Sequence, residues 1–243
     1  FDSGGQTALG VQTENSRQWF YIYTAQQRLE SYYRLPVLAY ERPVHSVGIV
    51  INGVKGGVTY MREPISGPNF AFTGYVYGGR EMSMGTFIHE TAGHAFGLLG
   101  DEYSTSGFDP GQPFEIPDYE ATRLRNEQKK GWYLNLSLTS DPKSVYWAHL
   151  IGHPRYPYVG VLQGGYYYAF GVWRSESYSL MENSTNFYFN TICRELIVRR
   201  IMALTGEEYT FDKFLAKDSD KDRPNLSKSR SQQIKDQERR HQP

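Results

Sequence analysis

The segment that decides the fold of this chain is HETAGHAFGLLGDEY, which occupies residues 89–103. It contains two histidines, His89 and His94, and a glutamate, Glu90, directly after the first of them. An acidic pair begins farther along, at Asp101. Two imidazole nitrogens and a carboxylate oxygen form a typical catalytic zinc site, in which three protein ligands leave a fourth position for water. The segment therefore predicts a zinc site, with Glu90 beside it as a general base.

The interval between the two histidines is five residues, whereas four residues bring two rings onto one face of a regular α-helix. Five residues advance about 500°, which would leave the rings about 140° apart. A π-helical turn absorbs the extra residue and places positions i and i+5 above each other. Gly93 removes a side chain where such a turn would be crowded. The sequence thus predicts a π-type turn. The alternative is a coincidental match, with His89 and His94 as two ordinary, partly buried histidines.

The residues after the second histidine are expected to bring a third ligand back to the metal. Glycine adopts a left-handed backbone conformation readily, so Gly97 is predicted to end the helix in that conformation. Asp101 is the predicted third ligand. Glu102 is predicted to orient a ligand or to pair with a nearby cation, and it is also the alternative third ligand. For an isolated Asp-Glu pair, a solvated acidic turn would be the simpler interpretation.

This segment resembles the zinc segment of the IgA-peptidase-like metallopeptidases, a group of metzincin type. In that family the helix with the zinc-binding histidines runs into a segment that ends in Asp-Glu-Tyr. The matching residues here are Gly93-His94-Ala95-Phe96-Gly97, Leu99 and Asp101-Glu102-Tyr103. The five-residue interval departs from the commonest spacing of the family. The resemblance implies an α/β (α+β) fold with a metzincin-like catalytic domain, in which a mixed twisted sheet carries the zinc-binding helix.

A second part of the resemblance lies downstream, in the run Ser179-Leu180-Met181-Glu182-Asn183. Metzincin-type enzymes place a methionine in a tight turn beneath the metal, followed by a C-terminal helix. Met181 and a helix predicted near residues 189–204 look like that arrangement. Methionine also fills irregular gaps in ordinary cores, so a plain core residue is the alternative for Met181. The resemblance covers about residues 40–205.

The remaining pattern predicts a single catalytic domain over residues 1–216 and a polar, charged tail over 217–243. Strands are expected at 45–52, 57–61 and 70–77. A charged helix is expected from Asp118 to Lys130, with acids early and bases late.

The sequence also predicts a strand from Trp132 to Leu138 and an aromatic hairpin over 159–173 that turns at Gly164-Gly165. The hairpin contains Tyr166-Tyr167-Tyr168. These aromatic side chains either pack into the sheet or form one wall of a substrate cleft.

The composition excludes some partners and one kind of cross-link. The chain has 26 basic and 26 acidic residues, so its formal net charge is zero. This balance predicts no broad attraction to nucleic acid or to an anionic membrane. No apolar run is long enough to span a bilayer. The single cysteine, Cys193, cannot form an intrachain disulfide and is predicted to be buried. We expect a secreted, periplasmic or cell-surface location of bacterial type, although this chain, which starts at Phe1, contains no signal segment.

The predicted reaction is the hydrolysis of a peptide bond in a protein or peptide substrate. Zinc would activate a water molecule, and Glu90 would accept its proton and pass it to the leaving amine. Tyr103 and Tyr178 are candidates for binding the oxyanion or the substrate. Two alternatives are a non-catalytic module that binds a glycan or a protein, with a structural or absent metal, and a zinc amidase that acts on cell-wall peptides.

Overall fold

The computed structural model describes residues 12–15, 20–23, 43–51, 57–61, 68–74, 80–104 and 113–218. Of the predicted tail, only Lys217 and Asp218 belong to these residues. Both are part of the fold, because α5 (Phe211–Lys217) ends at Lys217 and the carboxylate of Asp218 forms an ion pair with Arg194, at 2.6 Å.

The N-terminal half contains a mixed sheet, as the sequence predicts. Its strands are β3 (Ser46–Ile51), β5 (Asn69–Gly74) and β4 (Gly57–Tyr60), in the order β3-β5-β4. β3 runs parallel to β5, and β4 pairs with β5 antiparallel. Among the described strands, β4 therefore lies at an edge of this sheet. A separate antiparallel pair joins β1 (Gln12–Asn15) to β2 (Phe20–Tyr23).

The predicted π-helical turn is present. α2 (Arg80–Ile88) continues directly into the π-helix η2 (His89–Phe96). η2 packs against the sheet, where the side-chain amide of Asn69 donates a hydrogen bond to the Ala95 carbonyl, at 2.8 Å. The extra residue of the five-residue interval is thus accommodated by widening the helix over two turns.

The C-terminal half begins with the charged helix α3 (Asp118–Lys129), whose bounds match the prediction closely. A second small sheet follows, with strands β6 (Leu136–Ser137), β8 (Tyr168–Arg174) and β7 (Leu162–Gly165) in the order β6-β8-β7, all antiparallel. The short 3₁₀-helix η3 (Ala148–Leu150) lies between β6 and β7.

Two predictions in this half are wrong in their details. The strand predicted from Trp132 is reduced to β6, because Tyr133 has a positive φ of 54° that interrupts an extended backbone. The hairpin turns at Tyr166 and Tyr167, whose φ angles are 50° and 71°, and not at the preceding glycines. Those glycines form the end of β7 instead. Glycine was expected at the turn because tyrosine rarely adopts positive φ.

The last helices are α4 (Thr191–Thr205) and α5. α4 begins where the Asn190 side chain accepts a hydrogen bond from the Cys193 backbone N–H, at 3.0 Å, and ends at Gly206, which has a φ of 73°. These are ordinary signals for the two ends of a helix. Cys193 is fully buried, as predicted.

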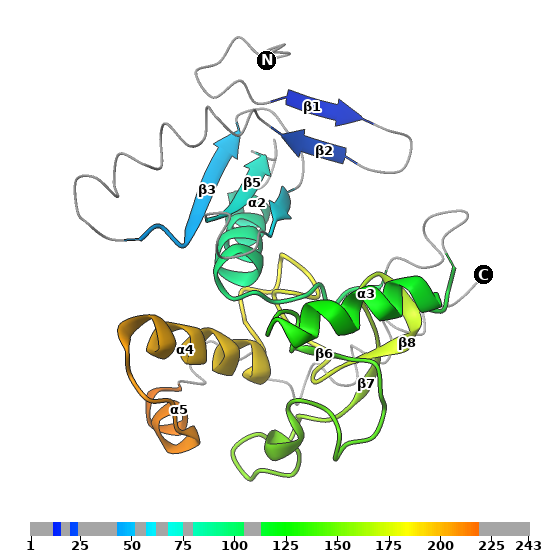
Figure 1. Ribbon diagram of the computed structural model, residues 1–243, viewed down its shortest axis with the longest axis vertical. Coiled ribbons are helices and arrows are strands. Elements are labelled where there is room, and N and C mark those ends of the chain that lie inside the picture. Colours follow the sequence, from blue (N-terminus) through cyan, green and yellow to red (C-terminus); the bar gives the residue numbers. More distant parts are fainter. Residues whose placement is uncertain are drawn as a thin grey trace.

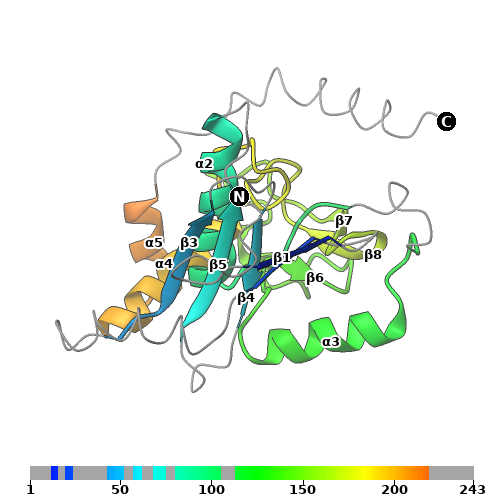
Figure 2. The same ribbon diagram turned by 90° about the horizontal axis from the view of Figure 1, so that it is seen from above.

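The two halves meet at η2. Figure 1 shows the sheet and α2 in the upper part of the molecule and α3, α4 and α5 in the lower part. Both views place α3 on the side opposite to the α4–α5 pair (Figure 2). The main core joins α4 and α5 to the segment around Trp147 and includes Met181, whereas a smaller core packs Leu124 of α3 against β6 and β8. In the part of the chain that the structure describes, no helix has both the length and the apolar character to cross a membrane.

Candidate metal centre

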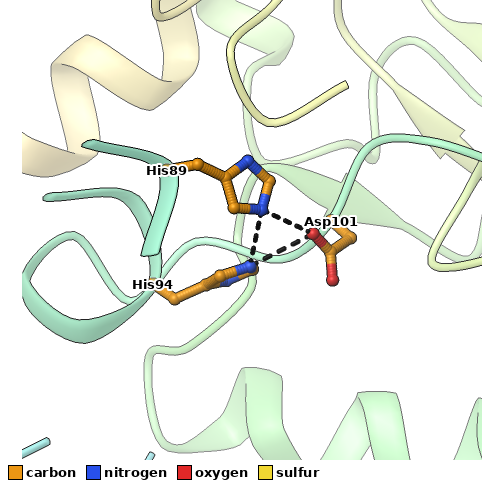
Figure 3. Close-up of side chains that lie close together, drawn as sticks. All are labelled: His89, His94 and Asp101. Atoms are coloured by element: carbon orange, nitrogen blue, oxygen red, sulfur yellow. Dashed lines mark hydrogen bonds and ion pairs between the residues drawn. The ribbon is translucent and has the colours of Figure 1, made fainter. Parts of the chain in front are cut away.

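Three predicted ligands converge at one point between the two halves. The Nε2 atoms of His89 and His94 lie 3.0 Å apart, and the Asp101 Oδ1 lies 3.0 Å from the first and 3.1 Å from the second. Figure 3 shows both rings and the carboxylate pointing toward one another. All three residues are at least 90% buried. The structure therefore brings together the two histidines and the acid predicted from the sequence.

The donor set fits a metal ion. The candidate ligand atoms lie within 4.8 Å of one another. Tetrahedral zinc with bonds of about 2.0–2.1 Å needs its ligand atoms about 3.3 Å apart. The present spacing of 3.0–3.1 Å requires only a small outward movement. Two neutral imidazoles and one carboxylate also match a site that leaves a coordination position open.

The charges at this point suit a cation. Burial alone lowers the pKa of His94, but the charge of Asp101 and their hydrogen bond outweigh it and raise the pKa to about 9. Burial alone would raise the pKa of Asp101, but the charge of His94 and hydrogen bonds from both imidazoles hold it well below its ordinary value. Asp101 is thus a carboxylate in the folded protein. A bound metal cation would replace the proton that lies between the His94 imidazole and the Asp101 carboxylate.

The outer atoms of the three residues are also held. The Nδ1 atoms of His89 and His94 hydrogen-bond to the carbonyls of Leu180 and Leu99, at 2.9 and 2.6 Å. A carbonyl can only accept, so each Nδ1 carries a proton and each Nε2 faces the cluster, where it becomes a metal ligand once the proton that it shares with Asp101 is displaced. The Oδ2 of Asp101 accepts a hydrogen bond from the Tyr167 hydroxyl, at 2.6 Å. Such outer contacts fix the orientation of metal ligands and raise metal affinity.

Met181 lies in a turn beneath η2 and is fully buried. The backbone N–H groups of Glu182 and Asn183 both donate to the Ser179 carbonyl, at 3.1 and 3.0 Å, which closes the turn. A side chain at Gly93 would overlap the Met181 sulfur atom. A side chain is thus excluded at Gly93, as predicted, but the crowding atom belongs to the turn around Met181 and not to the widened helix. The same turn supplies the Leu180 carbonyl that orients His89.

The prediction for Gly97 is wrong in its reason. Gly97 has a right-handed φ of −73°, and Leu98 takes the left-handed conformation, with a φ of 58°. A β-carbon at Gly97 would lie 2.8 Å from the carbonyl oxygens of both Ala92 and Gly93. The glycine is required because the widened helix brings its own carbonyls too close, and not because of its φ angle.

Glu90 is buried beside the cluster. The Thr59 hydroxyl of β4 lies 2.6 Å from its Oε2 and 3.0 Å from its backbone carbonyl. A β-carbon on Gly57 would lie only 2.6 Å from the Glu90 Cγ, so β4 can approach Glu90 because residue 57 is a glycine. The edge strand thus holds the carboxylate in place.

Glu102 does not join the three ligands. It is fully buried and points into a polar network, in which the side-chain amide of Asn135 donates to it at 2.9 Å and that of Asn190 at 2.8 Å. Burial raises its pKa. The backbone N–H of Glu102 donates to the Met181 carbonyl, at 2.8 Å. Glu102 therefore connects the loop that carries Asp101 to the turn around Met181 and to the start of α4.

An open pocket of about 560 Å³ adjoins the cluster. Its lining includes Glu90, His94 and Asp101, the edge strand β4, and residues of α3 and the hairpin. Tyr103 also lines it, with its ring centroid 6.5 Å from that of His89. Tyr178 is not among the lining residues, and its ring lies 6.2 Å from the ring of Tyr188. The hairpin tyrosines, Tyr166 to Tyr168, line the pocket, so they form part of its wall.

Two contributors were not predicted from the sequence. Tyr167 contacts Asp101 from 66 positions away, and Thr59 contacts Glu90 from 31 positions away. Neither lies in a recognisable motif. The only relevant signal was the run of three tyrosines, which pointed to a wall of the pocket but not to a ligand contact.

Comparison with known proteins adds no family assignment. No protein-family model matches the chain, and no curated protein sequence matches it. The case for a function therefore depends on the site itself.

Proposed function

We propose that this protein is a zinc-dependent endopeptidase of the IgA-peptidase-like, metzincin type, with His89, His94 and Asp101 as the zinc ligands. The observation that carries this proposal is the position of Glu90. A buried carboxylate beside a three-ligand cluster, with both facing one open pocket, is the arrangement that metal-assisted hydrolysis requires. A purely structural zinc site has four protein ligands and no use for such a base.

Bound zinc supplies a Lewis acid that activates water and polarises the carbonyl under attack. The chain supplies the proton transfers. Glu90 takes a proton at its carboxylate and later donates it to the leaving amine. The hydrogen bond from Thr59 keeps this carboxylate in one orientation. A catalytic group that is already oriented lowers the entropic part of the activation barrier. The hydrogen bonds from both Nδ1 atoms keep the imidazoles in the tautomer that presents Nε2.

The pocket supports a polypeptide substrate. The edge strand β4 lines one side of it, and the tyrosines of the hairpin line another. An edge strand offers backbone groups to an extended chain. Tyr103 lines the pocket and its ring lies beside that of His89. Of the two proposed oxyanion or substrate contacts, Tyr103 is therefore better placed than Tyr178. A secreted, periplasmic or cell-surface location goes with this proposal.

The substitution Glu90→Gln tests the proposal. The protein should be loaded with zinc, and its metal content measured by mass spectrometry before and after dialysis. We expect the variant to retain zinc and to lose cleavage of casein by about a hundredfold or more, because a positioned base contributes about 10²–10⁴ in rate.

The matched control is Glu127→Gln, which removes the same charge on α3 outside the pocket and should cleave casein as the wild type does. If Glu90→Gln cleaves casein at the wild-type rate, Glu90 is not the base. If the zinc-loaded wild type cleaves neither casein nor a peptide library, the endopeptidase proposal is wrong. Cleavage of cell-wall peptides alone would assign the protein as an amidase. Anomalous scattering at the zinc edge identifies the metal and its ligands directly.

A further inference from the structure

Four tyrosine rings form a row that begins at the candidate metal centre. The ring centroid of Tyr103 lies 6.5 Å from that of His89 and 5.1 Å from that of Tyr167. The row continues to Tyr166, at 5.9 Å from Tyr167, and to Tyr133, at 6.0 Å from Tyr166. Neighbouring rings are tilted or edge-on to one another, as aromatic pairs prefer. All four tyrosines line the pocket, so the row forms a continuous aromatic wall.

The backbone of this row is strained. Tyr133, Tyr166 and Tyr167 have φ angles of 54°, 50° and 71°. Within the described part of the chain, Leu98 is the only other non-glycine residue with positive φ. Side chains with a β-carbon disfavour this region, and such strain gathers at sites of binding and catalysis. Glycine would fit these turns better, so the tyrosine side chains have a use that packing of the turn does not explain.

The far end of the row meets α3. Arg123 and Glu120 of α3 line the pocket there. Arg123 thus lines the same pocket as Tyr166 and Tyr133, the last two rings of the row. The neighbouring Tyr166, as the largest cause, and then Glu120 raise the pKa of Arg123. Arg123 and Glu120 approach to 3.7 Å, and the Arg123 side chain is 66% exposed. Its cationic face is therefore accessible from the pocket.

The charges at this end cancel. Glu120 balances Arg123, and the next acid of the helix, Glu127, pairs with Lys130 at 3.1 Å. Because these charges are paired, this end of the pocket provides no net electrostatic attraction for a charged side chain. An uncharged aromatic group bound here would be stabilised by dispersion, by contacts with the tyrosine rings and by a cation–π contact with Arg123.

We propose that this tyrosine row is a substrate subsite that binds an uncharged aromatic side chain, near the bond to be cleaved, with Arg123 at the far end of the bound ring. The occupant is the peptide substrate, because the row is continuous with the candidate metal centre. This inference rests on the proposed endopeptidase function. An extended peptide advances about 3.3 Å per residue, and centroid steps of 6.5, 5.1 and 5.9 Å lead from His89 to Tyr166, so the aromatic residue should lie within about five residues of the cleaved bond.

A peptide-library digest by the zinc-loaded protein tests the subsite. We expect Phe, Tyr or Trp to be enriched at one position within about five residues of the cleaved bond. Arg123→Ala should raise the KM for a selected aromatic peptide about two- to fivefold at unchanged kcat, because a cation–π contact is lost. It should leave the KM for the matched alanine peptide unchanged. The control is Arg125→Ala, which removes the same charge from an exposed position of α3 outside the pocket.

Binding separates a failure of the subsite from a failure of the proposed function. The aromatic peptide and its alanine analogue should be titrated calorimetrically into zinc-loaded Glu90→Gln protein, with tighter binding of the aromatic peptide expected. Tyr133→Ala should reduce the ratio of the two dissociation constants, alanine peptide to aromatic peptide, about tenfold. If Tyr133→Ala does not fold, the more exposed Arg123→Ala decides the point. Cleavage without aromatic preference, or equal binding of the two peptides, overturns the subsite and leaves the peptidase proposal standing. Preferential binding of an oligosaccharide would also overturn it.

Discussion

Asp101 and Glu102 are neighbours in sequence and carry the same charge, yet they belong to two different regions of the molecule. Asp101 faces both imidazoles and the open pocket. Glu102 is turned away, fully buried, and bound by the amides of Asn135 and Asn190. Among the residues that the structure describes, the first region has three candidate metal ligands and no fourth. The second region is a closed hydrogen-bond network. A site that takes a ligand leaves a coordination position open, whereas a structural network satisfies its own groups.

The widest difference between the two acids should appear in metal binding. Asp101→Ala should reduce zinc affinity by at least about a thousandfold, since the loss of an outer contact alone costs about 10- to 100-fold. Its melting temperature without metal should also fall, because Asp101 pairs with both imidazoles and accepts a hydrogen bond from Tyr167. Competition with a chromogenic chelator measures the affinity. An unchanged affinity would show that another residue supplies the third ligand.

Glu102→Ala should show the opposite result, with the larger effect on stability. It leaves the buried amides of Asn135 and Asn190 without their shared acceptor. We expect a loss of about 3 to 5 kcal/mol in the free energy of unfolding, because each unsatisfied buried group costs about 1–3 kcal/mol. Urea denaturation of the metal-free protein measures this loss. A variant as stable as the wild type, but unable to bind zinc, would reverse the comparison.

The closed network should also depend on pH through Glu176. Burial, as the largest cause, raises the pKa of Glu176 to about 7, while Arg194 opposes this rise and Glu102 adds to it. The ordinary value is 4.5, so between the two values the folded protein binds more protons than the unfolded chain. Stability therefore falls as the pH rises from about 4.5 to about 7.

Glu176→Gln removes this penalty, and its amide oxygen can still accept from the Thr191 N–H, as Glu176 does at 2.7 Å. The variant should be up to about 3 kcal/mol more stable than the wild type at pH 8. Near pH 4 the two should be equal. Thermal melts at both pH values provide the measurement, and a difference that does not change with pH would contradict the assignment.

Tyr167→Phe should have the smallest effect of these substitutions. It concerns the region of Asp101, which faces the open pocket. It removes the hydrogen bond to the outer oxygen of Asp101, without removing a ligand. Zinc affinity should fall about tenfold, which is typical for an outer contact. Tyr168→Phe is a suitable control, because it removes a hydroxyl from the same wall of the pocket at a position with no contact to the ligands. Equal affinities of the two variants would show that Tyr167 does not position Asp101.

Much of the site was predictable because it lies within a few turns of chain. The five-residue interval between His89 and His94 leaves a π-helical turn as the local way to align the rings, and the structure contains it. Gly93 was predicted to make room, but its neighbour, Met181, comes from 88 positions farther along the chain. The predicted conformations of Gly97 and of the hairpin turn were wrong, because residue preferences describe turns in isolation. Close contacts in the folded chain overrode both preferences.

The sequence by itself determined the kinds of donor atom, the widened helix that aligns two of them, and the absence of an intrachain disulfide. Those properties follow from residue identity and from spacing along one stretch of backbone. Only the tertiary structure decided that Asp101 and not Glu102 faces the imidazoles, that Thr59 holds Glu90, and that strained tyrosines line the pocket. The physical reason is distance along the chain. Thr59 and Glu90 lie 31 positions apart, Tyr167 and Asp101 lie 66 apart, and Asn190 and Glu102 lie 88 apart. Only packing of the folded chain brings these pairs within hydrogen-bonding range.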